Sequence, residues 1–376
     1  MIRAAAKLKL RRPRLSGTLS GYIARQFTGR WAAFFLGLSG IIVLVSMVDL
    51  LDRFANKPGA GLGIILTMVL LRLPHLVQEV MPFTVLFSGL ATFWRLTRAH
   101  ELVVARAAGV SVWQFLLPVL SVAALIGVVS VTVLNPVASA LLGRFEQIEA
   151  RFSGRQESAL ALSGSGLWLR QADRDGQSVV HAARASPDSM TLHRVIVFRF
   201  GANDRFLSRI DASRAVLGDG VWRITDAALS VPGARTRRVE AMELETELTP
   251  AKILESFADP ETISFWSLPS FVRLLENAGF SAQRHKLQLN RLLATPLLLA
   301  AMILLAATFS LRPQRQGHVA LVVVLGMLAG FLLYFLSNFV FALGLSGKIP
   351  VILAGWAPAG ISAMLGLAML LHLEDG

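Results

Sequence analysis

Long apolar stretches separated by short polar breaks make up most of the chain, and only the middle departs from this pattern. A helix needs about 17–25 mainly apolar residues to cross a bilayer core of roughly 30 Å. Six stretches meet this requirement, at residues 31–48, 62–93, 112–133, 287–311, 319–343 and 351–371. The sequence therefore predicts a membrane protein with six transmembrane α-helices, three on each side of the middle segment.

The middle segment contains short runs rich in Val, Ile, Phe and Trp, with partial alternation of polarity. Turn pairs such as Asp175-Gly176 and Pro232-Gly233 separate these runs. Many short strands with regular turns favour an all-β sandwich or jellyroll-like domain. We therefore divide the chain into 1–139 (a basic N-terminal arm and three helices), 140–265 (the inserted β domain) and 266–376 (a short amphipathic helix and three helices).

The second apolar stretch is longer than one span requires, and Pro74 and Pro82 predict a kink in it. It also carries Arg72, His75 and Glu79, whose spacing places all three on one helix face. Charged residues at membrane depth usually face a cavity or the interior of a bundle. These three residues form either a functional cluster or, as we favour, a group at the outer interface that reaches water.

The composition, with 54% hydrophobic and 16% charged residues, is typical of membrane proteins. The net charge is +13, but residues 140–284 hold 18 basic and 18 acidic residues, so the basic excess lies next to the predicted spans. The positive-inside rule accounts for this distribution and places both termini in the cytoplasm and the β domain on the outer side of the membrane. No nucleic-acid-binding module accompanies the charge, and we expect no nucleic-acid partner.

Motifs that would indicate an enzyme are absent from the sequence. It contains no G-x-x-x-x-G-K-[ST] loop, no H-E-x-x-H and no G-x-S-x-G, and its seven histidines show no metal-ligand spacing. Cysteine is also absent, which excludes disulfides and thiolate chemistry. We therefore expect a non-catalytic chain without a metal or cofactor of its own, and we favour transport over catalysis.

The polar break at residues 95–110 joins the second and third spans and has partly helical character. It carries several arginines but a single acid, Glu101. A helix at the cytoplasmic face that joins two spans is a place where a soluble partner can push. One acid there can make a charge-assisted contact to a partner arginine. The alternative is an ordinary connecting loop whose charges are solvated.

An ordered series of short motifs resembles the LptF/LptG permeases of lipopolysaccharide export. In the first half these motifs are Pro74–Pro82 (PHLVQEVMP), Glu101–Val104 (ELVV) and Ala108–Ser111 (AGVS). In the second half they are Pro296, Thr308–Ser310 (TFS) followed by Arg312, Gly330-Phe331, Tyr334-Phe335, Leu343-Gly344 and Ala354–Pro358 (AGWAP). The last motif, Val48-Asp49 and Val221–Ile224 (VWRI) resemble the LptG branch more than the LptF branch. Each motif is weak alone, but their order along nearly the whole chain is specific.

The resemblance implies a permease subunit in the inner membrane of a Gram-negative bacterium. Such a subunit pairs with an LptF-like permease, binds two LptB-like ATPase subunits that carry ATP and Mg²⁺, and contacts an LptC-like bitopic protein. The complex extracts lipopolysaccharide from the outer leaflet and passes it to a periplasmic bridge. The resemblance also implies that Glu101 contacts the ATPase, with Arg98 and Arg106 as neighbouring contacts.

Three further sets of residues follow from the resemblance. Arg53 and Lys57 are candidates for the lipid headgroup. Family members often carry several lysines near this end of the first span, so their absence here favours a lipid A with fewer or replaced phosphates. The candidates for a lateral gate are Phe331, Tyr334 and Phe335, and the candidates for the interior of the β domain are Trp168, Val195, Val197 and Trp222.

Three other functions remain open from the residues alone. The chain could be a permease of another ABC exporter or mechanotransmitter type, a membrane-anchored scaffold whose β domain binds a partner, or an intramembrane enzyme. A second chain with the same plan of three spans, a domain and three spans would favour the exporter. Activity of the single purified chain would favour the enzyme.

Overall fold

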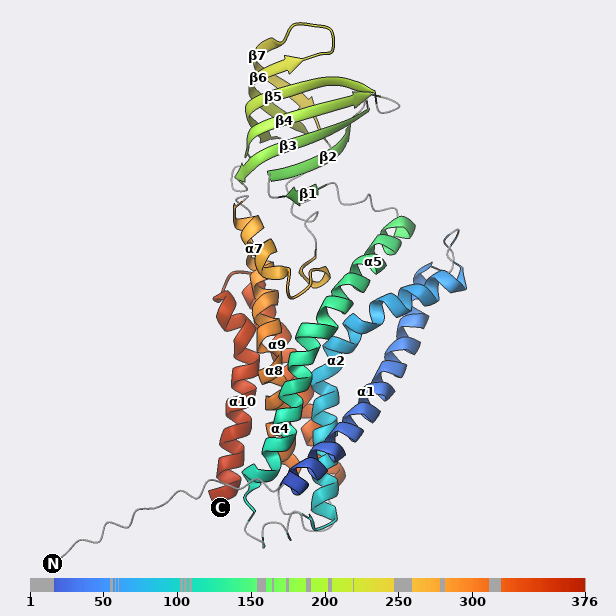
Figure 1. The fold of residues 1–376 in the computed structure, drawn as a ribbon, viewed down its shortest axis with the longest axis vertical. Coiled ribbons are helices and arrows are strands. Elements are labelled where there is room, and N and C mark those ends of the chain that lie inside the picture. Colours follow the sequence, from blue (N-terminus) through green and yellow to red (C-terminus); the bar gives the residue numbers. More distant parts are fainter. Residues whose placement is uncertain are drawn as a thin grey trace, which may run out of the picture.

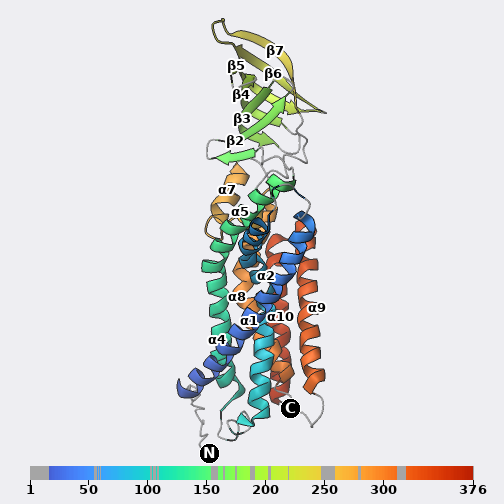
Figure 2. The same ribbon diagram turned by 90° about the vertical axis from the view of Figure 1, so that its right-hand side faces the viewer.

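The computed structural model places a bundle of long helices beneath a curved β-sheet (Figure 1). It describes residues 17–375 except 55–56, 58, 60, 102–103, 105–106, 108–109, 154–159, 164–165, 174–175, 187–190, 202–204, 219, 247–258, 278–280 and 311–318. The first helix begins, and the last one ends, at the end of the bundle that lies away from the sheet (Figures 1 and 2).

Six helical segments in the described part of the chain are long and apolar enough to cross a membrane, which confirms the predicted number. They are α1 (Gly17–Phe54), α2 (Leu62–Arg98), the continuous run of α4 (Val112–Val129), η1 (Ser130–Leu134) and α5 (Asn135–Ser153), then α8 (Gln283–Ser310), α9 (Val319–Leu345) and α10 (Val351–Asp375). The inserted sheet follows α5, so the plan of three helices, a β domain and three helices holds.

Two helices are longer than their apolar stretches. The 38 residues of α1 span about 57 Å, well beyond a bilayer core of roughly 30 Å. The third span continues through α5 to Ser153, past residue 140, where we expected the β domain to begin. An apolar stretch marks only the part of a helix that lipid covers. At the ends of α1, polar turns continue the helix because no helix-breaking pair interrupts them.

Helix α2 stays continuous through Pro74 and Pro82 but bends (Figure 1). Its first half leans toward the end of α1, and its second half runs down the bundle. Proline removes one backbone hydrogen bond and crowds the preceding turn, which explains the bend. The predicted kink is therefore present.

A third proline produces the wide π-helical turn η1. Pro136 has no N–H to donate, so the Thr132 carbonyl one turn earlier loses its α-helical partner, while Asn135 N donates to Ser130 O in the wider turn. Side chains from two other segments also donate to carbonyls of this turn, and Trp266 takes the place of the missing Pro136 donor. Gln78 Nε2 on α2 donates to Ser130 O at 2.9 Å, and Trp266 Nε1 donates to Thr132 O at 3.1 Å. The third apolar stretch ends at residue 133, but the helix continues through Asn135-Pro136 to Ser153, and these donors stabilise the turn.

The described strands form one antiparallel sheet in which each strand pairs with its neighbours in sequence. They are β1 (Leu160–Ser163), β2 (Gly166–Asp173), β3 (Gly176–Ser186), β4 (Thr191–Gly201), β5 (Phe206–Leu217), β6 (Val221–Ser230) and β7 (Arg237–Glu245). The prediction of an inserted all-β domain is confirmed. Among the described strands the pairing is that of a meander, and the pairings between strands distant in sequence that define a jelly roll are not among them.

The sheet nevertheless encloses a core because it curls. Gln171 on β2 accepts hydrogen bonds from Trp222 Nε1 on β6 at 3.2 Å and from Thr246 Oγ1 at 2.6 Å, although four strands separate β2 from the end of β7. Its own Nε2 donates to Glu245 O at 3.1 Å. The side-chain polar groups of Gln171, Trp222 and Thr246 are therefore all hydrogen-bonded inside an apolar core, where an unpaired polar atom would destabilise the fold.

One amphipathic helix, α7 (Leu268–Asn277), lies beneath the sheet and contributes to its core (Figure 1). Val272 and Leu275 belong to the same buried cluster as Val195 and Trp222 from the strands. The predicted amphipathic helix is thus present, and it connects the β domain to α8. The sheet stands on the bundle through a packed apolar contact as well as through its two connecting segments.

The bundle packs tightly where α4 crosses α8. A Cβ atom added at Gly127 would lie 2.6 Å from the Cα atom of Pro296, closer than carbon atoms pack without a backbone shift. Small residues at such crossings let membrane helices approach closely. Gly40 on α1 offers a contrast, because no atom lies within 4 Å of its added Cβ.

We expect Gly127→Ala to destabilise the protein by about 1–3 kcal/mol, the usual effect of overpacking. Gly40→Ala should have no such effect, since an alanine there meets open space and suits a helix. Thermal unfolding of both variants in one detergent, followed by tryptophan fluorescence, measures the difference. Equal unfolding temperatures for the two variants would contradict the close packing of α4 against α8.

Candidate functional site

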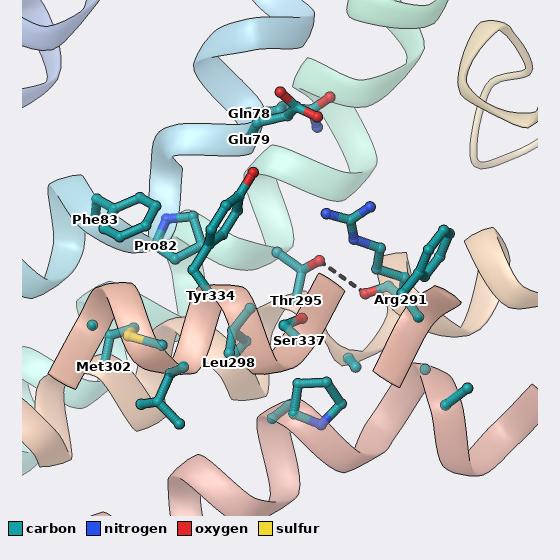
Figure 3. Close-up of a pocket in the computed structure, with 18 residues that line it drawn as sticks. Gln78, Glu79, Pro82, Phe83, Arg291, Thr295, Leu298, Met302, Tyr334 and Ser337 are labelled. Carbon is teal, nitrogen blue, oxygen red and sulfur yellow. Dashed lines mark hydrogen bonds between the residues drawn. The ribbon is translucent and has the colours of Figure 1, made fainter. Parts of the chain in front are cut away.

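A cavity of about 100 Å³ lies among α2, α8, α9 and α10. Its polar groups gather at one end (Figure 3): Glu79 and Gln78 come from α2, and the guanidinium of Arg291 faces them from α8. Leu298 and Met302 lie at the other end. The cavity is smaller than the roughly 300–1,000 Å³ of a typical ligand pocket, but its charged end suits a polar group and its apolar end a short segment of an alkyl chain.

Aromatic rings connect α2 to α9 beside this cavity. The Phe83 ring lies 5.1 Å from that of Phe331 and 5.2 Å from that of Tyr334. The Tyr334 hydroxyl points toward the polar end of the cavity (Figure 3). The third gate candidate, Phe335, is 73% exposed and points away from the bundle. The structure thus brings together two of the three residues that the resemblance implied for a gate.

Helices α1 and α9 present apolar side chains to the outside of the bundle. Figure 2 looks onto this side, where α1 crosses in front and α9 stands beside it. Helix α2 packs against both of them. The large exposed side chains include Leu36, Ile41, Leu44, Val45 and Val48 on α1 and Leu328, Phe331, Leu332, Phe335 and Phe339 on α9. Lipid or a second membrane protein is the environment that such a surface requires.

The N-terminal end of α1 holds the end of α2 through polar contacts. Tyr22 donates to Glu101 Oε1 at 3.3 Å, and Gln26 donates to the Tyr22 hydroxyl at 2.8 Å while accepting from Arg95 Nη1 at 3.0 Å. Glu101 is partly exposed, and Arg98 lies over the ring of Trp94. Arg106, the third candidate for coupling, lies outside the described residues.

The charges at the other end of α1 are already paired. Arg53 Nε donates to Asp49 Oδ1 at 2.9 Å, and Arg72 on α2 lies 3.7 Å from the other oxygen of the same carboxylate. Lys57 is exposed to solvent. The two headgroup candidates therefore differ, because an adjacent acid partly neutralises Arg53.

The cluster considered on α2 separates into two groups. Arg72 turns toward Asp49 and lies over the Phe145 ring, whereas His75 Nε2 pairs with Glu261 Oε2 at 3.2 Å. This hydrogen bond lowers the pKa of the Glu261 carboxyl, although burial opposes the shift. Glu261 lies on η4 (Pro260–Thr262), between the sheet and α7. The pair ties α2 to the segment that returns from the β domain.

Three of the four residues expected inside the β domain lie in its core. Val195, Val197 and Trp222 are buried together with the apolar residues of the other strands. Trp168 alternates with buried Leu167, so it lies on the opposite face, with its ring 4.4 Å from that of His181 on β3.

Comparison with known proteins identifies the family. A model of the lipopolysaccharide export system permease LptF/LptG matches residues 21–372, nearly the whole chain. The chain belongs to the LptF/LptG family. It is 28% identical over 368 residues to lipopolysaccharide export system permease protein LptG of Escherichia coli K12, covering 95% of this chain and 98% of that protein. It is 22% identical over 357 residues to LptG of Haemophilus influenzae Rd, covering 91% of this chain and 95% of that protein.

The functional geometry of this LptF/LptG family chain includes residues that sequence reasoning missed. Tyr22 and Gln26 lie outside the first apolar stretch, and only the extended α1 brings them to Glu101. Gln78 lies inside the motif that carries the resemblance, but its partner Ser130 is 52 positions away. Glu261 had no local signal, since its relation to His75 depends on how the β domain returns to the bundle.

We expect Phe83→Ala to loosen α9. It removes two aromatic contacts worth about 0.5–1.5 kcal/mol each, which corresponds to roughly tenfold faster local opening. Hydrogen–deuterium exchange of peptides from Val324–Leu345, compared with peptides from α8, measures the change. Phe339→Ala is the matched control, because that ring is 55% exposed. Unchanged exchange in Phe83→Ala would show that other contacts hold α9.

Proposed function

We propose that this chain is the LptG-type permease subunit of a lipopolysaccharide exporter in the inner membrane of a Gram-negative bacterium. It works with an LptF-like permease, two LptB-like ATPase subunits that bind ATP and Mg²⁺, and an LptC-like bitopic protein. The complex extracts lipopolysaccharide from the outer leaflet and passes it to a periplasmic bridge. The observation that carries this proposal is that the chain belongs to the LptF/LptG family and exposes large apolar side chains along α1 and α9.

A second permease subunit would cover the side that α1 and α9 form. Both helices expose large apolar side chains there, and α2 between them carries the aromatic contacts to α9. A lipid held between two subunits needs an entrance that opens sideways to the membrane. Phe331, Tyr334 and Phe335 on α9 suit such a gate, because few contacts hold this helix to its own bundle.

Glu101 is the acid that we assign to the ATPase contact, with Arg98 and Arg106 beside it. Its partial exposure and its bond to Tyr22 support this assignment. A push on this segment would act directly on α1, because Gln26 bonds both to Tyr22 and to Arg95 at the end of α2. ATP hydrolysis in the cytoplasm would thus move one wall of the lipid path.

The orientation follows from charge. Basic residues concentrate at the end of the bundle where α1 begins, which by the positive-inside rule is cytoplasmic. Both termini then lie in the cytoplasm, and the β domain lies in the periplasm, where its apolar core (Val195, Val197 and Trp222) would receive acyl chains if the curled sheet opens. Trp168 lies on the outer face of the sheet and is a candidate for a protein contact instead.

The test of this function is assembly followed by transport. Co-expression with the candidate ATPase, LptF-like and LptC-like chains and affinity purification should yield one complex with two ATPase copies by native mass spectrometry. In proteoliposomes this complex should release lipopolysaccharide only with ATP. If the folded chain binds no ATPase, the result would favour a membrane-anchored scaffold over a permease subunit. If the purified chain alone is catalytically active, the result would favour an enzyme.

We expect Glu101→Ala to abolish ATP-driven release and to reduce recovery of the ATPase by about tenfold, as for loss of a charge-assisted contact worth ~1.5–3 kcal/mol. Tyr22→Phe removes the partner of Glu101 inside the chain and keeps the carboxylate, so it should retain most of the ATPase. Asp52→Ala, an acid at the other end of α1, is the second control. Full transport by Glu101→Ala would refute the coupling role.

We expect Asp49→Asn to raise the preference for bis-phosphorylated over dephosphorylated lipid A. Two arginines lose their shared carboxylate, an exposed pairing worth about 0.2–1 kcal/mol, so the change should be about two- to fivefold. Competition binding with the two lipids measures it, and Asp52→Asn is the matched control. Wild-type preference for the bis-phosphorylated lipid, or bis-phosphorylated lipid A in the source organism, would contradict a site suited to fewer phosphates.

A further inference from the structure

Three side chains that commonly bind metals meet at the outer end of the bundle. His75 and Glu79 are one helical turn apart on α2, and Glu261 approaches from η4. One ligand atom from each lies within 4.8 Å of the others, and all three residues are partly buried. Side-chain movements of about 1 Å would bring such atoms to the ~2.0–2.2 Å bond lengths that zinc requires.

Beyond the His75–Glu261 pair, the negative charge in this group has no paired cation among the described residues. Glu79 makes no hydrogen bond or ion pair in the part of the chain that the structure describes, although it is partly buried. Glu146 on α5 and Asp259 lie within electrostatic range of each other and of Glu261. Carboxylates that gather away from bulk water repel one another unless a cation lies among them.

The nearby arginines do not supply that cation. Arg72 is directed at Asp49 and the Phe145 ring. Arg284 and Arg291 on α8 act on Glu261 from a distance, but neither forms an ion pair with Glu79 or Glu261 among the described residues. The Arg291 guanidinium lies 5.0 Å from the centre of the Phe341 ring.

We propose that His75 Nε2 and one carboxylate oxygen each from Glu79 and Glu261 bind a Zn²⁺ ion. Calcium and magnesium take oxygen ligands alone, whereas an imidazole with two carboxylates suits zinc. Three protein ligands leave a fourth position for water or for an anionic oxygen. The ion takes the place of the hydrogen bond that now joins His75 to Glu261.

This assignment concerns the outer end of the bundle and does not depend on which lipid the permease carries. It differs from the expectation of a metal-free chain, which rested on the spacing of histidines in the sequence. His75 and Glu79 come from one helix, but Glu261 comes from the segment that follows the β domain in the sequence. A bound ion would fix the segment that leads from the sheet into α7 against α2, at the level where η1 is also tied to α2.

The test measures metal in the full complex. The tag-free complex is loaded with Zn²⁺, dialysed, and its metal content is determined by mass spectrometry, while Co²⁺ substitution reports the coordination by visible absorption. We expect one Zn²⁺ per copy of this chain. His75→Gln, Glu79→Gln and Glu261→Gln should each weaken binding more than about 100-fold, since loss of even an outer-shell partner weakens metal binding about 10–100-fold.

His372→Gln and Glu276→Gln are the matched controls and should bind as the wild type does. His372 lies near the end of α10, and Glu276 pairs with Lys286. Glu79→Gln keeps the test decisive if another variant fails to fold, because replacing an unpaired carboxylate does not weaken the fold. Wild-type protein without zinc, zinc retained by Glu79→Gln, or selective retention of Ca²⁺ or Mg²⁺ would overturn the assignment.

Discussion

The rule that a membrane imposes on the backbone, that every carbonyl needs a donor, shapes this molecule around Pro136. The proline leaves the Thr132 carbonyl without its α-helical donor, and Trp266 in the segment before the fourth span supplies one. Gln78 on the second span adds a second donor to Ser130 O, which also accepts from Asn135 N. Asn135 Oδ1 accepts from Phe265 N at 2.8 Å and completes the joint. The two halves of the bundle and the exit of the β domain therefore meet at one polar point within an apolar interior, and the cavity lies just below it.

The number of spans, their order and the β insertion could all be predicted from the sequence, because the length of an apolar run is a local property. The bend in α2 was equally accessible, since proline acts within one helical turn. The continuation past Asn135-Pro136 was not predicted, because its stabilising donors lie far away in the sequence. The meander order was inaccessible for a similar reason, since alternation shows which residues share a face but not which strands pair.

The candidate sites also combine features that local sequence predicts with features that only the fold determines. Glu101, Arg98 and the α9 aromatics were found from local motifs and from a family resemblance. Their surroundings came only from the fold: Tyr22 beneath Glu101, Asp49 beside Arg53 and Phe83 beneath Tyr334. Trp168 also needed the register of β2, which directs it away from the core that its hydrophobicity suggested. Which charges pair, and which face of a sheet or helix a side chain lies on, depend on the tertiary structure. They could not be predicted from this one sequence alone.

The meander also bears on how the chain is made. Every strand pairs with the one synthesised just before it, so each pairing closes a short loop, and domains dominated by local contacts fold fast. A sheet of this order can form hairpin by hairpin, before the last three helices of the chain are synthesised. Only the contact from Gln171 to Trp222 and Thr246 has to wait for the final strand. Closure of the sheet thus coincides with the arrival of α7, which packs into its core and begins the return to the membrane.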